Sequence, residues 1–183
     1  MNDFTIDPAV GTLLAAAFAL LFASAALHKL LDLERNAEVI AAYAVVPSVL
    51  SRLAGLVPLI ELAIGIGLLV GAWRARAALA AALALVAYAA AIATNLRRGR
   101  LDLSCGCGGA NDRRPIAAWM VWRNLALAML VAVLLLPSAS RRLDVTDALT
   151  ILGGVLVLVL LYVSVDTLLS RVAPRAAALR DSS

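Results

Sequence analysis

Five long apolar runs, separated by polar stretches, constrain the fold of this chain more than any other feature of its sequence. The hydrocarbon core of a bilayer is roughly 30 Å thick, and a helix crosses it with about 20 apolar residues. The runs are continuous and rich in Leu and Ala, whereas the strands of membrane β-barrels are short and alternate. The sequence predicts an all-α integral membrane protein, a bundle of about five transmembrane helices near 8–30, 52–73, 76–96, 115–137 and 147–169.

The composition excludes the other broad classes. Of the 183 residues, 63% are hydrophobic and 15% are charged, whereas a soluble domain is about half apolar and a quarter charged. High apolar content is also the opposite of the disordered signature. No basic block is rich enough to indicate nucleic-acid binding. With no internal repeat or linker, we expect one domain over 1–183, with a cysteine loop at 97–114, a polar tail at 171–183 that frays, and a short interfacial helix within 31–52.

The distribution of basic residues predicts which side of the membrane each loop faces. The side with the cysteine loop carries eleven Lys and Arg residues, and the opposite side carries four. Loops rich in Lys and Arg usually stay in the cytoplasm. The count therefore predicts a cytoplasmic cysteine loop.

Polar residues within the spans are concentrated near the cysteine-loop side. Ionisable groups in a membrane are costly, so function is the first hypothesis for them. Glu61 is eight residues into its predicted span, about 12 Å deep at 1.5 Å per residue. Arg123 lies at a similar depth. We expect one polar cluster beneath the cysteine loop, made of His28, Lys29, Glu61, Asn95, Arg123, Asn124 and Asp166.

Each member of this cluster also has a structural interpretation. Glu61 and Arg123 could form an ion pair that only fixes helix register. His28 and its neighbour Lys29 could anchor the first helix at the headgroups. We interpret Lys29 and Asp166 as residues at the membrane boundary.

The two cysteines, Cys105 and Cys107, are separated by Gly106 and followed by two further glycines. A disulfide requires Cα atoms about 4.4–6.8 Å apart, and Gly106 admits backbone angles that relax this constraint. A strained, accessible disulfide is readily reduced. Five arginines nearby in the sequence favour the reactive thiolate. The pair is therefore a candidate redox couple.

Other interpretations of the cysteines remain open. A structural disulfide is disfavoured because so short a loop constrains the unfolded chain very little. A metal site could use both thiols with Asp102 or His28, although a closed zinc site normally needs four strong ligands. The two thiols could also be inert. The sequence identifies no cofactor: a quinone is compatible with a membrane redox protein, but no quinone-binding motif can be read.

Several stretches together resemble the methylamine utilisation protein MauE family, within the wider DoxX-like group. They are HKLLDLERNAEVIAAYAVVP after the first run, LIELAIGIGLLV, ATNLRRGRLDLSCGCGG and WMVWRNLALAML. The resemblance covers most of the chain. By this resemblance, seven residues of the chain match the family's sequence pattern: His28, Glu61, Asn95, Cys105, Cys107, Arg123 and Asn124.

The resemblance implies a bacterial inner-membrane protein that assists processing, export or disulfide formation of the small (beta) subunit of methylamine dehydrogenase. That subunit is periplasmic and rich in disulfides, and the implied partner is thioredoxin-like MauD. We interpret the chain as a thiol–disulfide exchange protein, with a non-enzymatic membrane scaffold or export helper as the alternative. A periplasmic client conflicts with a cytoplasmic cysteine loop. Either electrons are relayed across the membrane, or the loop arginines serve another purpose.

Overall fold

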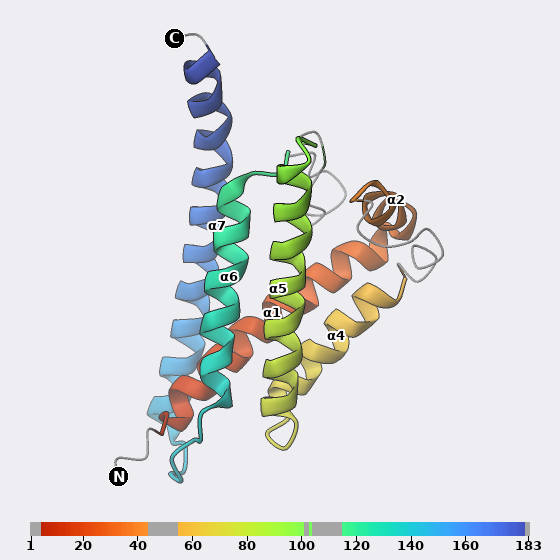
Figure 1. Cartoon of the computed structure of the whole chain (residues 1–183). Helices are drawn as coiled ribbons and strands as arrows, with labels where there is room; N and C mark the ends of the chain where they lie inside the picture. Colours follow the sequence, from red (N-terminus) through yellow and green to blue (C-terminus); the bar gives the residue numbers. More distant parts are fainter. Residues whose placement is uncertain (1–4, 44–54, 101–102, 104–114, 182–183) are drawn as a thin grey trace.

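The computed structural model describes residues 5–43, 55–100, 103 and 115–181, with side chains up to Ser170. This part of the chain contains six α-helices and one 3-10 turn (Figure 1). They are α1 (Pro8–Leu31), α2 (Leu33–Tyr43), α4 (Leu56–Leu69), α5 (Arg74–Arg97), α6 (Ala118–Ala132), η1 (Val133–Leu135) and α7 (Val145–Asp181). The predicted all-α membrane class is confirmed, and the short helix expected within 31–52 is present as α2.

Four helices are long and apolar enough to cross a membrane: Pro8–Leu31, Arg74–Arg97, Ala118–Leu135 and Val145–Ser170. The second predicted span, 52–73, is a shorter apolar helix, α4, of 14 residues. At 1.5 Å per residue α4 rises about 21 Å, less than the roughly 30 Å of hydrocarbon. Residues 52–54 lie outside the described part. At the other end the chain leaves the helix at Val70, and the Arg74 side chain donates to the Leu68 carbonyl oxygen at 3.2 Å.

The helices run alternately between two ends of the molecule (Figure 1). The N-terminus of α1, the turn between α4 and α5, and the connection between α6 and α7 share what we call the Asp7 end. The opposite end, called here the Leu103 end, carries α2, the last turn of α5 and the start of α6. This alternation agrees with the sidedness expected from the sequence. The cysteine-bearing stretch 104–114 itself lies outside the described residues.

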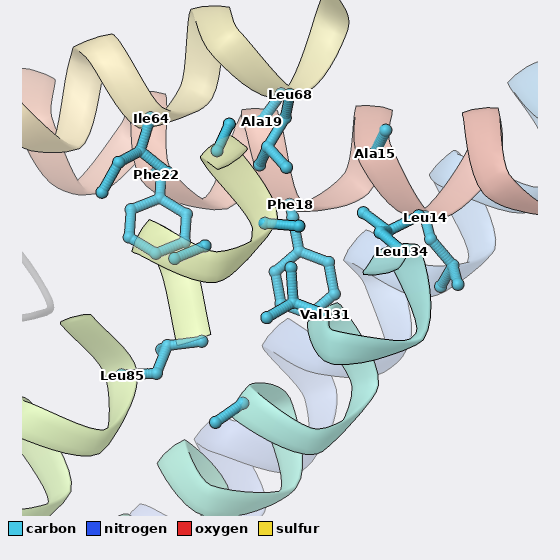
Figure 2. Packing of buried hydrophobic residues seen from close by; sticks show 14 residues of the cluster. Leu14, Ala15, Phe18, Ala19, Phe22, Ile64, Leu68, Leu85, Val131 and Leu134 are labelled. Atoms are coloured by element: carbon cyan, nitrogen blue, oxygen red, sulfur yellow. The ribbon is translucent and has the colours of Figure 1, made fainter. Parts of the chain in front are cut away.

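The core joins two helix pairs, α1 with α4 and α5 with α6, while α7 packs mainly on α1. Figure 2 shows Phe18 of α1 lying between Leu68 of α4 and Val131 of α6, and Phe22 of α1 next to Ile64 of α4. A Cβ added at Gly65 would lie 3.2 Å from the Ala19 carbonyl oxygen. Small residues thus allow α1 and α4 to approach closely, which matters in lipid, where packing drives helix association.

The ends of α1 and α5 follow common capping patterns. The Asp7 side chain accepts from the Ala9 amide at 2.8 Å, and Pro8 occupies the first turn, where its missing N–H costs nothing. Gly99 adopts a positive φ of 69° after α5. The Arg100 amide then donates to the Asn95 carbonyl and the Gly99 amide to that of Leu96, both at 3.1 Å. This is a Schellman motif, for which glycine is preferred.

Helix α7 continues through the polar tail that was expected to fray. Its backbone is helical from Val145 to Asp181. The last turns contain the run Ala176–Arg180, and Ala, Leu and Arg are strong helix formers. The helical backbone therefore continues beyond the apolar part, which ends near Ser170.

Candidate functional site

The two cysteines fall outside the described residues, but the structure describes both sides of the stretch that contains them. The Ile116 amide donates to the Leu103 carbonyl oxygen at 2.9 Å. Ile116 is 3% exposed and packs with Ile92 and Met120, and Leu103 lies against the same cluster. The cysteine-bearing stretch therefore begins and ends on one packed base. The proposed metal alternative involves Asp102 and both thiols, which also lie outside the described part.

A buried ionic group links α1, α4 and α5 below this base. The Lys29 ammonium and the Tyr88 hydroxyl both donate to Glu61 Oε1. The ammonium also lies over the Tyr88 ring, 5.0 Å from its centroid. The side chains of Lys29 and Glu61 are only 11% and 3% exposed, so the low dielectric makes their attraction strong and their desolvation expensive. We call these three residues the Lys29 group.

The charges of the Lys29 group balance, but the two carboxylate oxygens of Glu61 differ in their hydrogen bonds. Glu61 Oε1 accepts from two donors, while Oε2 is buried without a hydrogen-bond partner among the described residues. The ion pair and the two hydrogen bonds join side chains of α1, α4 and α5. The geometry therefore favours a fixed link between three helices.

A second ionic group links α6 to α7. Arg123 pairs with Asp166, and both side chains are 15% exposed. The Arg123 guanidinium also lies 5.2 Å from the Trp119 ring centroid and 5.9 Å from that of Tyr162. Aromatic faces attract cations, and a desolvated contact of this kind contributes about 2 kcal/mol. We call these four residues the Arg123 group.

The expectation of one polar cluster is thus resolved into two groups with different partners. Glu61 pairs with Lys29, and Arg123 pairs with Asp166, so the suggested Glu61–Arg123 pair is wrong. The physical reason is the packing of α4 on α1, which carries Lys29 and brings it to Glu61. The long Lys29 stem lets its ammonium reach the carboxylate.

Sequence reasoning includes Lys29 and Asp166 in the cluster but interprets them as boundary residues, and it does not single out Tyr88. Lys29 and Asp166 lie at the same membrane side as Glu61 and Arg123, and their opposite charges were the available signal. Tyr88 has no comparable signal, because a single tyrosine in an apolar span is not unusual.

The remaining candidates have separate positions. Asn95 is fully buried, and its Nδ2 donates to the carbonyl oxygens of Tyr43 at 3.1 Å and Ala91 at 3.0 Å. Asn124 is buried in α6 and donates to the Met120 carbonyl at 2.8 Å. His28 is exposed on α1, in contrast to its neighbour Lys29. Exposure at the end of a span agrees with the interfacial interpretation of His28.

We expect the Asp166→Asn variant to lose about 1–3 kcal/mol of stability, because Arg123 would lose its carboxylate partner while staying partly buried. Unfolding in detergent micelles with increasing dodecyl sulfate measures this loss. The exposed Ser164 on the same helix supplies the control Ser164→Ala. Equal unfolding midpoints for Asp166→Asn, the control and the parent would contradict the role of the pair.

Arg141, Asp7 and Asp147 form an ionic network at the Asp7 end, which we call the clasp. Arg141 bonds Asp7 at 2.8 and 3.0 Å and Asp147 at 2.6 and 2.8 Å. The Ile6 amide donates to the Pro137 carbonyl at 2.9 Å alongside. The clasp thereby ties the start of α1 to the start of α7. The hydrogen bonds from Arg141 and from the Ala9 amide hold the pKa of Asp7 below its usual value.

The lowered pKa of Asp7 predicts a loss of stability in acid. A carboxyl whose pKa is lower in the folded state stabilises fully above its unfolded value, about 3.9, and this contribution disappears as the pH falls through the folded value. We expect Asp7→Asn to flatten part of the decrease in melting temperature between about pH 5 and pH 2. Glu38→Gln, at an exposed site on α2, is the control. If the melting temperatures of Asp7→Asn and the parent fall by the same amount between about pH 5 and pH 2, this prediction is wrong.

Comparison with known proteins identifies relatives along nearly the whole chain. A family model described as "Methylamine utilisation protein MauE" matches residues 7–137. The "Methylamine utilization protein MauE" of Paracoccus denitrificans is 37% identical over 171 residues, covering 92% of this chain and 91% of the relative. Those of Methylophilus methylotrophus and Paracoccus versutus are 35% and 38% identical, with 91% and 92% of this chain and 89% and 91% of the relative covered. No solved structure matches.

Proposed function

Because the chain belongs to the methylamine utilisation protein MauE family, whose name implies a role in methylamine utilisation, we propose that it assists maturation of the methylamine dehydrogenase small (beta) subunit by thiol–disulfide exchange. Cys105 and Cys107 are the redox pair. The single observation that carries this proposal is the CGC sequence, which holds the only two thiols of the chain on an arginine-rich stretch.

The proposed exchange is balanced without a further reactant. When the two thiols of this chain form their S–S bond, they give up two electrons and two protons. The disulfide of a thioredoxin-like partner of the MauD type accepts both and becomes a dithiol. In the reverse direction the partner is oxidised instead, and the difference between the two reduction potentials sets the direction.

The described residues support this function by fixing the surroundings of the pair. Near the Leu103 end, the Lys29 group links α1, α4 and α5. The Arg123 group links α6 and α7 at the same end. His28, Glu61, Asn95, Arg123 and Asn124 are supporting residues in this proposal. The protein is a multi-pass membrane protein, and we place it in the bacterial inner membrane, next to a periplasmic partner.

Alkylation of the thiols in intact cells tests the redox proposal. We expect a mass shift that depends on prior reduction in the parent, and none in a Cys105→Ser/Cys107→Ser variant. Thiols that stay reduced under every oxidant would overturn the proposed exchange and favour a scaffold with inert cysteines.

An impermeant maleimide, applied to single-cysteine variants, determines the side of the membrane. Labelling from outside supports direct exchange with a periplasmic partner. Labelling only after the cells are opened would agree with the charge count, and would require electron relay across the membrane.

A further inference from the structure

The connection between α4 and α5, at the Asp7 end (Figure 1), brings together a tryptophan and two arginines. Arg74 Nε donates to the Leu68 carbonyl oxygen at 3.2 Å, which holds this side chain against the last turn of α4. The Arg76 guanidinium lies over the Trp73 ring, 5.5 Å from its centroid. A carbonyl oxygen and a ring thus orient the two guanidinium groups, but neither neutralises the charge that it contacts.

These two positive charges have no carboxylate partner among the described residues. The first turn of α5 contains no acidic residue, and cations at this end of a helix oppose the helix dipole. Arg141, at the same end of the molecule, is instead neutralised by Asp7 and Asp147. Arg74 and Arg76 therefore do not stabilise α5 by their charge, and an anion beside them would.

The length of α5 places the two arginines at the level of the lipid headgroups. The span Arg74–Arg97 has 24 residues, so it rises about 36 Å at 1.5 Å per residue. The hydrocarbon core is only roughly 30 Å thick, which leaves the ends of the span outside it. Tryptophan is enriched at this level of a membrane, and a long arginine stem extends its charge into the headgroup layer.

An apolar strip on α5 begins directly at Arg76. Leu79 and Leu83 follow three and seven positions later, so they share the helix face of Arg76. Both leucines are exposed, as are Arg76 and the Trp73 ring. The face thus has a cation at the headgroup level and apolar side chains along the hydrocarbon, the same order of charge and apolar surface as in a phospholipid.

We propose that Arg74, Arg76 and Trp73 bind the headgroup of an anionic phospholipid, whose acyl chains lie along Leu79 and Leu83. The planar guanidinium donates two parallel hydrogen bonds to phosphate oxygens, a match that a point charge does not give. The phosphodiester supplies the anion that the two arginines lack within the described residues. This lipid site is independent of the proposed redox function.

The test measures lipid binding by the full chain in detergent micelles. Native mass spectrometry separates lipid-bound from lipid-free protein during titration with phosphatidylglycerol, which is anionic, or phosphatidylcholine, which is zwitterionic. Inorganic phosphate, added as a competitor of phosphatidylglycerol, distinguishes a lipid site from a site for any small anion. Arg142→Ala is the matched control, because Arg142 is an exposed arginine at the same end of the molecule, in the connection between α6 and α7.

We expect the parent to bind phosphatidylglycerol more tightly than phosphatidylcholine. Arg76→Ala should weaken binding of phosphatidylglycerol by about fivefold, the usual contribution of one basic residue at an anionic membrane surface, whereas Arg142→Ala should leave it unchanged. Arg76→Lys keeps the charge but loses the planar fork, so it should recover only part of the affinity. Trp73→Leu removes the ring beneath Arg76 and should also weaken binding.

Equal losses of affinity for Arg76→Ala and Arg142→Ala would overturn the proposal, because binding would then follow overall charge and not this site. Equal affinities of the parent for the two lipids would overturn it as well. So would displacement of phosphatidylglycerol by inorganic phosphate at the same concentration. Unfolding in dodecyl sulfate checks that each variant keeps the parental stability, as expected for changes at exposed side chains.

Discussion

Replacing either Cys105 or Cys107 with serine is expected to abolish maturation of the methylamine dehydrogenase small subunit. A single remaining thiol can attack a partner disulfide, but it cannot resolve the mixed disulfide that forms, so turnover stops after one event. The measurement is the amount of correctly bridged small subunit, separated on non-reducing gels from cells that express each variant. Wild-type amounts of correctly bridged small subunit in either variant would contradict the proposed function.

The two serine variants should also differ from each other. The variant that keeps the attacking cysteine accumulates a mixed disulfide with the thioredoxin-like partner, whereas the other accumulates none. Ser104→Ala, next to Cys105 in the same stretch, is the matched control and should support normal maturation. A scaffold with inert cysteines instead gives normal maturation in all three variants.

Length and hydropathy were sufficient to predict most of the fold. The runs at 8–30, 76–96 and 115–137 closely match α1, α5 and α6 with its 3-10 turn, because a span must be apolar over a length set by the bilayer. The second run was harder, since its apolar residues continue past the true helix end. Val70 is extended and begins the turn to α5, so the helix stops although the sequence stays hydrophobic.

The partners of the buried charges could not be predicted in the same way. Depth estimates count residues from the ends of a predicted span, so an early or late helix end shifts every estimate. Helix tilt adds a further error, and Figure 1 shows α1 and α4 inclined to the other long helices. Depth therefore suggested Glu61 with Arg123, whereas packing of α1 on α4 brings Lys29 to Glu61.

The hydrogen bonds from Arg100 to Ala42 and from Asn95 to Tyr43 could not be predicted from the sequence for another reason. Their acceptors are backbone carbonyl oxygens, which carry no residue-specific signal. Asn95 was singled out as a polar residue at the end of a span, but its contact with Tyr43 requires the tertiary structure.

The Lys29→Met variant is expected to lose about 3–5 kcal/mol of stability, the usual penalty when one partner of a buried ion pair is removed. Glu61 is only 3% exposed, and its short side chain cannot reach the headgroups. Glu61→Leu should cost less, because Lys29 lies near the end of α1 and its long stem can carry the ammonium to the interface. Dodecyl sulfate unfolding in micelles measures both losses.

The double variant Lys29→Met/Glu61→Leu separates stability from chemistry. Apolar replacement of both partners of a buried pair is often neutral or stabilising, so we expect the double variant to be more stable than Lys29→Met and close to the parent. If the Lys29 group only links α1, α4 and α5, this double variant should also support normal maturation of the small subunit. A double variant that is stable, correctly inserted and inactive would contradict a purely linking role, because the charges themselves would then be needed, as in proton transfer. Tyr88→Phe, which removes only the hydroxyl donor, should in the linking case change stability by about 1 kcal/mol and leave maturation unchanged.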